Sequence, residues 1–205
     1  MPDFHKAPPA VLSFAATDPS SGAGIQADVL TLASMGCHPL SVITAITVQD
    51  TSGVEDVLPI DADWVADQAR SILEDIPVAA FKIGVLGSVE NVLAVAEIIS
   101  DYPEIPLIFD PVLASGRGDE LSSEEIISAI REMLLPQTTL LTPNAPEARR
   151  LVETLRSDPG ADAAVRQAVG EFLFRAGDGA DGARAFSEIV EFARSEEHTS
   201  ELQSR

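Results

Sequence analysis

The chain has 205 residues, of which 45% are hydrophobic, and its 33 acidic and 13 basic side chains give a formal net charge of −20. A chain of this length can bury one sizeable core, whereas its charge excludes nucleic acid as a partner because the phosphate backbone would be repelled. No apolar stretch is long enough to span a membrane, and the start lacks the basic cluster and apolar core of a signal peptide. We therefore expect a cytoplasmic protein without membrane contact. Its one cysteine, Cys37, excludes a disulfide framework.

A glycine- and serine-rich loop joins the first predicted strand to the first predicted helix. The apolar run at residues 11–15 has the length of a strand, and residues 23–35 place apolar side chains on one helical face. The free N–H groups and the dipole at the start of that helix favour a polar or anionic ligand. Glycines let such a ligand approach the backbone, and nearby carboxylates can accept its hydrogen bonds. The candidate binding residues are Asp18, Gly22, Gly24 and Asp28.

The same loop also fits the dinucleotide-binding pattern G-x-G-x-x-A at residues 22–27. In that pattern the first glycine follows the strand directly, whereas the residues TDPSS intervene here. A nicotinamide or flavin site is therefore disfavoured. The phosphate-binding pattern G-x-x-x-x-G-K-[ST] does not occur in the chain.

Four further apolar runs are predicted strands, with polar side chains at or near the carboxyl end of each. The runs are residues 40–48, 79–83, 107–109 and 140–142. The polar residues are Gln49 and Asp50 after the first run, Lys82 within the second, Asp110 after the third, and Asn144 and Glu147 after the fourth. Ligands of open α/β sheets bind at the carboxyl ends of the strands, so we expect the site at this edge.

Helices are predicted between these strands. The residues expected at their N-termini are Asp61, Ser88, Ser122, which has capping-box spacing to Glu125, and Pro146. The alternation of strands and helices predicts an α/β fold, a three-layer sandwich with a mostly parallel central sheet. Residues 53–60 are expected to form a short edge strand or part of an antiparallel flap.

These motifs, in this order, resemble the hydroxymethylpyrimidine/phosphomethylpyrimidine kinase family of thiamine biosynthesis, within the ribokinase-like superfamily. The matching segments are SFAATDPSSGAGIQAD, SVITAITVQDT, FKIGVL, IFDPVLASGRGD and LLPQTTLLTPNAPEA. The resemblance implies a ribokinase-like sandwich that uses ATP and Mg²⁺ to phosphorylate 4-amino-5-hydroxymethyl-2-methylpyrimidine and its monophosphate. It also implies a homo-oligomer. A pyridoxal-type vitamin kinase is the alternative within the same superfamily.

The resemblance also implies roles for the polar residues. It assigns the pyrimidine to Asp28 and Gln49 with Asp18, Gly22, Gly24 and Val85 beside them, the nucleotide to Asn144 and Lys82, and Mg²⁺ to Asp110 and Glu147. An amide suits the pyrimidine because it offers both a donor and an acceptor. From the residues alone, Gln49 could only cap its strand, and Lys82 could pair with a carboxylate or reach the sheet edge. Asp50 replaces the asparagine that is usual in the motif.

The last part of the chain departs from the family pattern. We expect residues 1–155 to be the N-terminal part of a kinase domain, 156–193 a divergent, weakly structured or helical segment, and 194–205 a tail derived from a sequencing adapter. The family's glycine-rich anion-hole segment has no match, so no catalytic residue is assigned. We therefore expect a C-terminally truncated, inactive fragment, poorly soluble because a sheet edge is unpaired. A pyrimidine- or nucleotide-binding remnant without turnover is the competing function.

Overall fold

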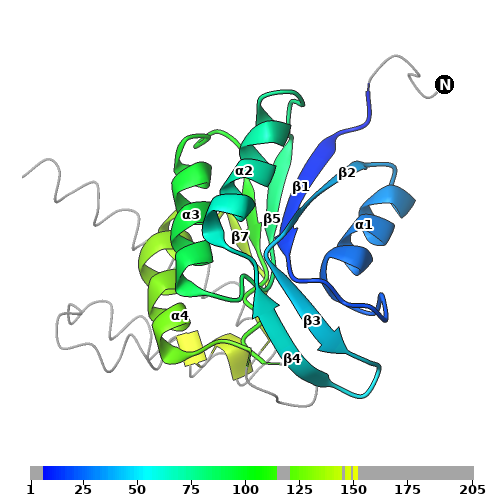
Figure 1. Ribbon diagram of the computed structural model, residues 1–205. Coiled ribbons are helices and arrows are strands. Elements are labelled where there is room, and N and C mark those ends of the chain that lie inside the picture. The colour runs from blue at the N-terminus through cyan, green and yellow to red at the C-terminus, as the bar shows by residue number, and fades with distance from the viewer. Residues whose placement is uncertain (1–6, 115–120, 145, 149, 152–205) are drawn as a thin grey trace, which may run out of the picture.

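Five strands form the central sheet of the computed structural model, which describes residues 7–114, 121–144, 146–148, 150 and 151. Their spatial order is β2-β1-β5-β6-β7, and every neighbouring pair is parallel (Figure 1). The strands are β1 (Ala10–Ala15), β2 (His38–Ile43), β5 (Ala80–Ile83), β6 (Leu107–Phe109) and β7 (Leu140–Leu141). The predicted mostly parallel sheet is confirmed.

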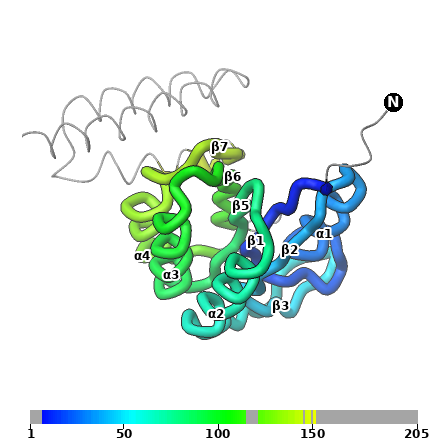
Figure 2. Tube along the Cα trace, turned by 90° about the horizontal axis from the view of Figure 1, so that it is seen from above, coloured from blue at the N-terminus to red at the C-terminus, as the bar shows by residue number. Residues whose placement is uncertain are grey.

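Helices cover both faces of this sheet, which confirms the predicted three layers. Figure 2 shows α1 on one face, and α2, α3 and α4 on the other. The helices are α1 (Gly24–Ser34), α2 (Ala62–Leu73), α3 (Val89–Ser100) and α4 (Glu124–Ala129), which continues through η1 (Ile130–Leu134) and η2 (Leu135–Gln137). None of the helices in the described part of the chain has the length and apolar character needed to cross a bilayer.

The core lies between the sheet and the layer that contains α2, α3 and α4. Phe14 on β1 and Phe81 on β5 are fully buried, and their ring centroids lie 6.2 Å apart. Val95 on α3 is fully buried in the same cluster. Side chains alternate between the two faces of a strand, so Lys82, which follows Phe81, points to the face that carries α1. A charged side chain can therefore lie on this strand, between the buried Phe81 and Ile83, without entering the core.

The predicted helix starts are correct for α2 and α3 and wrong by one residue for α4. The side chain of Asp61 accepts a hydrogen bond from Asp63 N, and that of Ser88 accepts one from Asn91 N. For α4 the cap is Ser123, not Ser122, because Ser123 has the extended conformation of an N-cap and its hydroxyl accepts from Ile126 N. Ser122 itself is buried.

The prediction of one strand over residues 40–48 is wrong. The run divides at Thr44 into β2 and β3 (Ala45–Gln49), and β3 leaves the sheet to pair antiparallel with β4 (Val54–Pro59). Thr44 is fully buried, and its Oγ1 donates to Val85 O at 2.6 Å while its carbonyl accepts from Ile60 N at 2.9 Å. The β3–β4 hairpin, here called the flap (residues 45–59), projects beyond the sheet (Figure 1). The antiparallel flap expected around residues 53–60 is confirmed.

Candidate active site

A cavity of about 270 Å³ opens at the carboxyl ends of β1 and β5, between the glycine-rich loop, the start of α1 and the flap. Seven of the ten predicted site residues line it: Asp18, Gly24, Asp28, Gln49, Lys82, Val85 and Asp110. Gly22, Asn144 and Glu147 are not among its lining residues. The structure therefore brings five of the six residues assigned to the pyrimidine together with two of the four residues assigned to the nucleotide and the metal.

Asp18 holds the glycine-rich loop in shape. Its Oδ1 accepts from the backbone N–H and the hydroxyl of Ser20, both at 2.8 Å, and its Oδ2 accepts from Ala23 N at 2.8 Å. Burial opposes ionisation of this carboxyl group, but the hydrogen bonds outweigh burial and lower its pKa. Both oxygens are thus engaged within the loop, so Asp18 shapes the cavity wall instead of offering a free carboxylate.

The two loop glycines differ in what they do. Gly24 has φ +60°, and a Cβ there would lie 2.5 Å from Ala16 O, so α1 can start against the end of β1 only with glycine at this position. A Cβ at Gly22 would meet only ordinary contacts, the nearest at 3.4 Å from Ser20 Oγ. Gly24 is therefore required by the packing of α1 against β1, and the expected close approach of a ligand stays a prediction at both glycines.

Lys82 and Asp28 form an ion pair inside the cavity. Lys82 Nζ donates to Asp28 Oδ2 at 2.9 Å, and the two side chains are only 23% and 17% exposed. Of the alternatives left open for Lys82, pairing with a carboxylate is the one that the structure contains. A Cβ at Gly84 would lie 3.1 Å from Lys82 Nζ, so this glycine leaves room for the ammonium group.

Asp110 and Glu147 are two carboxyl groups whose pKa values are both raised. Burial raises the pKa of Asp110, opposed by the charge of Lys82 and reinforced by that of Asp28. Burial likewise raises the pKa of Glu147, and the charge of Asp110 adds to this rise. Two neighbouring carboxylates that resist ionisation are a favourable setting for a divalent cation, and Mg²⁺ often uses only one or two carboxylates with water and phosphate oxygens. The described residues contain no cluster of three or more potential metal ligands.

Asn144 and Glu147 form a reciprocal cap at the start of the last described helical segment. Asn144 N donates to Glu147 Oε2 at 2.8 Å, and Glu147 N donates to Asn144 Oδ1 at 2.9 Å. This is a capping box, and its three-residue spacing was visible in the sequence. One Glu147 oxygen is therefore committed to the fold.

The flap supplies cavity residues that the sequence did not indicate: Thr47, Val54 and Val57. Thr47 N donates to Thr17 Oγ1 at 3.1 Å and Thr47 Oγ1 donates to Thr17 O at 2.7 Å, which ties the flap to the glycine-rich loop. Thr47 Oγ1 also lies 3.3 Å from Gln49 Oε1. Within the described residues nothing accepts from Gln49 Nε2, which leaves this donor available to a ligand. The period-two alternation of β3 was the signal that places Thr47 and Gln49 on one face.

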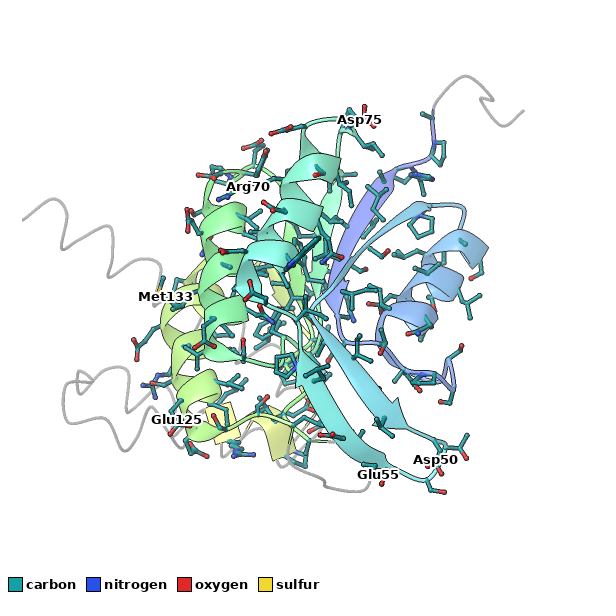
Figure 3. All side chains as sticks on the ribbon, viewed as in Figure 1. Asp50, Glu55, Arg70, Asp75, Glu125 and Met133 are labelled. Atoms are coloured by element: carbon teal, nitrogen blue, oxygen red, sulfur yellow. The ribbon has the colours of Figure 1, made fainter. Side chains whose placement is uncertain are left out.

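Asp50 lies at the tip of the flap and does not line the cavity. Figure 3 shows Asp50 and Glu55 together at this tip. Asp50 Oδ1 accepts from Ser52 N at 2.7 Å and Gly53 N at 3.1 Å, which closes the turn between β3 and β4. The replacement of the asparagine usual in the motif thus preserves a turn-forming acceptor.

A model of the family described as phosphomethylpyrimidine kinase matches residues 18–175. The chain belongs to this family. The match continues past Leu155, where the sequence resemblance was expected to fade. The predicted boundary at residue 155 and the segments 156–193 and 194–205 lie outside the described residues.

Relatives of known name agree with this assignment. The chain is 43% identical over 142 residues to the hydroxymethylpyrimidine/phosphomethylpyrimidine kinase of Escherichia coli (strain K12), which covers 69% of this chain and 53% of that protein. The protein of the same name from Mycobacterium bovis is 45% identical over 147 residues, 71% of this chain and 54% of that one. The chain thus spans about half the length of the curated relatives it matches.

Solved structures of this family and of pyridoxal kinases share the fold. The crystal structure of phosphomethylpyrimidine kinase from Clostridium difficile superposes with a TM-score of 0.67 at 34% identity, covering 82% of this chain and 71% of that chain. A pyridoxal kinase from Staphylococcus aureus, in complex with AMP-PCP and pyridoxal, gives 0.62 at 31% identity, covering 73% and 53%. The predicted ribokinase-like fold class is confirmed.

Proposed function

We propose that the whole protein transfers a phosphate from ATP to the hydroxymethyl group of 4-amino-5-hydroxymethyl-2-methylpyrimidine, and then phosphorylates the monophosphate. The observation that carries this proposal is the single cavity in which Asp28, Gln49 and Lys82 converge. Its volume of about 270 Å³ suits a small heterocycle. Family membership supplies the reaction class.

Asp28 and Gln49 are the proposed pyrimidine contacts. The Gln49 amide offers a donor and an acceptor to an aminopyrimidine edge, and its Nε2 has no acceptor among the described residues. Asp28 offers its Oδ1 to the amino group while Lys82 holds its Oδ2. The ion pair therefore fixes the orientation of the accepting carboxylate. Val85 and Val57 supply apolar surface for the ring.

Phosphate transfer depends mainly on positioning and charge neutralisation. Asp110 and Glu147 are the residues proposed to hold Mg²⁺, which would neutralise the nucleotide phosphates when bound. Asn144, which caps the helix together with Glu147, is the proposed nucleotide contact. In this account Lys82 acts on Asp28 and Asp110 instead of on the nucleotide. We assign no general base among the described residues.

Equilibrium titration of the chain with the pyrimidine tests the proposed contacts. Asp28→Asn and Gln49→Leu should each weaken binding about tenfold or more, because each removes a hydrogen bond to a polar ligand group. Asp67→Asn, which makes the same carboxylate-to-amide change at an exposed position on α2, should leave binding unchanged. The proposal would be refuted if both variants bound the pyrimidine as tightly as the unaltered chain, or if the unaltered chain did not bind it.

A pyridoxal-type kinase is the second candidate, supported by the structural similarity to the Staphylococcus aureus pyridoxal kinase. The two functions differ in the ring that the cavity accepts. Competition between pyridoxal and the aminopyrimidine separates them, and we expect the aminopyrimidine to displace pyridoxal. Tighter binding of pyridoxal than of the aminopyrimidine would instead support the pyridoxal-type kinase.

A further inference from the structure

Three backbone carbonyls converge on one side-chain nitrogen where the flap meets the rest of the protein. Asn91 Nδ2 lies 2.9 Å from Leu86 O, 3.0 Å from Thr44 O and 3.1 Å from Ile60 O. Thr44 directly precedes the flap and Ile60 directly follows it. Asn91 lies in the first turn of α3 and is fully buried. One amide thus contacts both ends of the flap and the segment after β5.

This amide is used as a donor only. Asn91 Oδ1 is buried and has no hydrogen-bond partner among the described residues. An unsatisfied buried acceptor costs about 1–3 kcal/mol, and an apolar side chain of similar volume would avoid that cost. The contacts made by Asn91 Nδ2 are therefore what offsets the cost of the unsatisfied Oδ1.

A second contact at the same place is independent of the amide. Gly87 has φ +84°, and a Cβ there would lie 3.1 Å from Ala45 Cβ and 3.6 Å from Pro59 Cβ. Ala45 and Pro59 are the first and last residues of the flap and pair with each other across its ladder. The segment from Leu86 to Asn91 therefore packs closely against both ends of the flap.

The flap in turn forms one wall of the ligand cavity. Thr47 and Gln49 on β3, and Val54 and Val57 on β4, all line it. The position of these side chains depends on the angle at which the flap leaves the sheet, and that angle is set where Thr44 and Ile60 are held.

We propose that Asn91 is a positioning residue that clamps both ends of the flap to the core and so holds Gln49 over the ligand cavity. The clamp follows from the contacts of Asn91 alone. Its consequence for pyrimidine binding rests on the proposed function. The Thr17–Thr47 contact restrains the middle of β3, whereas Asn91 restrains the points at which both flap strands join the protein.

Hydrogen exchange measured by mass spectrometry tests the clamp. Asn91→Leu keeps the approximate side-chain volume and removes the donor. We expect exchange in residues 45–59 to rise about tenfold relative to β1, since the free energy of local opening falls by the net value of one or two hydrogen bonds. The matched control is Val95→Ala, which weakens the core at a fully buried position on the same helix, four residues after Asn91. It should leave the ratio of flap to β1 exchange unchanged.

For every variant that folds, the test is the ratio of hydrogen exchange in the flap to hydrogen exchange in β1. An equal ratio in Asn91→Leu and Val95→Ala would overturn the clamp. If Asn91→Leu does not fold, Asn91→Asp replaces it, because a carboxylate has nearly the same shape and donates no hydrogen bond when ionised. A flap-to-β1 ratio equal to that of the unaltered protein in Asn91→Asp would likewise overturn the clamp.

The link to ligand binding is measured separately. Asn91→Leu should weaken pyrimidine binding about fivefold or more, while Val95→Ala leaves it unchanged, because only the former displaces Gln49. If the unaltered chain does not bind the pyrimidine but Asn91→Leu still loosens the flap selectively, the proposed function fails and the clamp stands. If the flap loosens and pyrimidine affinity does not change, the positioning role of Asn91 is wrong.

Discussion

Lys82 on β5 and Asp28 on α1 are joined inside the cavity by a 2.9 Å contact between Nζ and Oδ2. The two residues are far apart in the chain, one on a strand of the central sheet and the other on the helix that follows the glycine-rich loop. Among the described residues that line the cavity, Lys82 is the only base, and it faces the negative charges of Asp28 and Asp110. The electrostatic balance of the site therefore depends on this lysine.

We predict that Lys82→Met lowers the free energy of unfolding by about 2–3 kcal/mol, because it leaves Asp28 without its partner in a largely buried position. The double variant Lys82→Met with Asp28→Asn should recover much of that loss, since no unpaired Asp28 charge remains. Urea unfolding of the two single variants and the double variant measures this coupling. If the losses of unfolding free energy in the two single variants simply add in the double variant, the ion pair contributes nothing to stability.

Gly24→Ala should destabilise the protein by about 2 kcal/mol or more, because φ is positive at this position and the new Cβ would approach Ala16 O to an impossible distance. Gly22→Ala is the matched control in the same loop, where a Cβ has room. Urea midpoints for the two variants should differ clearly. A Gly24→Ala protein as stable as Gly22→Ala would mean that the start of α1 is not built as described.

Stability should depend on the ionisation of Asp18 at acid pH. Its pKa in the folded protein lies below the ordinary value of 3.8, so its contribution is present above that value and is lost as the pH falls through the folded pKa. Asp18→Asn should therefore be less stable than the unaltered protein at neutral pH, and the difference should shrink below about pH 4. Unfolding free energies of Asp18→Asn and of the exposed control Asp67→Asn measure the difference across this range. A constant difference for Asp18→Asn would contradict the account.

The sheet and helices could be predicted because their determinants are local. Apolar runs of strand length and capping residues such as Ser88 are visible without knowing what packs against them. The division at Thr44 was not predictable, because residues 40–48 form one continuous β-branched run and the break depends on distant contacts with Val85 and Ile60. The sequence therefore indicated the layers but not the point at which the flap leaves the sheet.

The site was predictable where a residue follows a strand directly and less so within the loop. Gln49 and Asp110 reach the cavity because strand ends meet at one edge. Gly22 does not, because the path of the loop is set by tertiary geometry that includes a positive φ at Ser21. The role of Asp18 could have been inferred, since aspartate side chains commonly accept a hydrogen bond from the backbone two residues further on. The donor-only role of Asn91 has no local signal.

A crystal structure of the chain with bound 4-amino-5-hydroxymethyl-2-methylpyrimidine tests the central claim most directly. We predict that the ring lies in the cavity between α1 and the flap. Its amino group should contact Asp28 and its heterocyclic edge should contact the Gln49 amide, while Lys82 remains paired with Asp28. A pyrimidine bound elsewhere, or bound in the cavity without contact to either Asp28 or Gln49, would contradict this account.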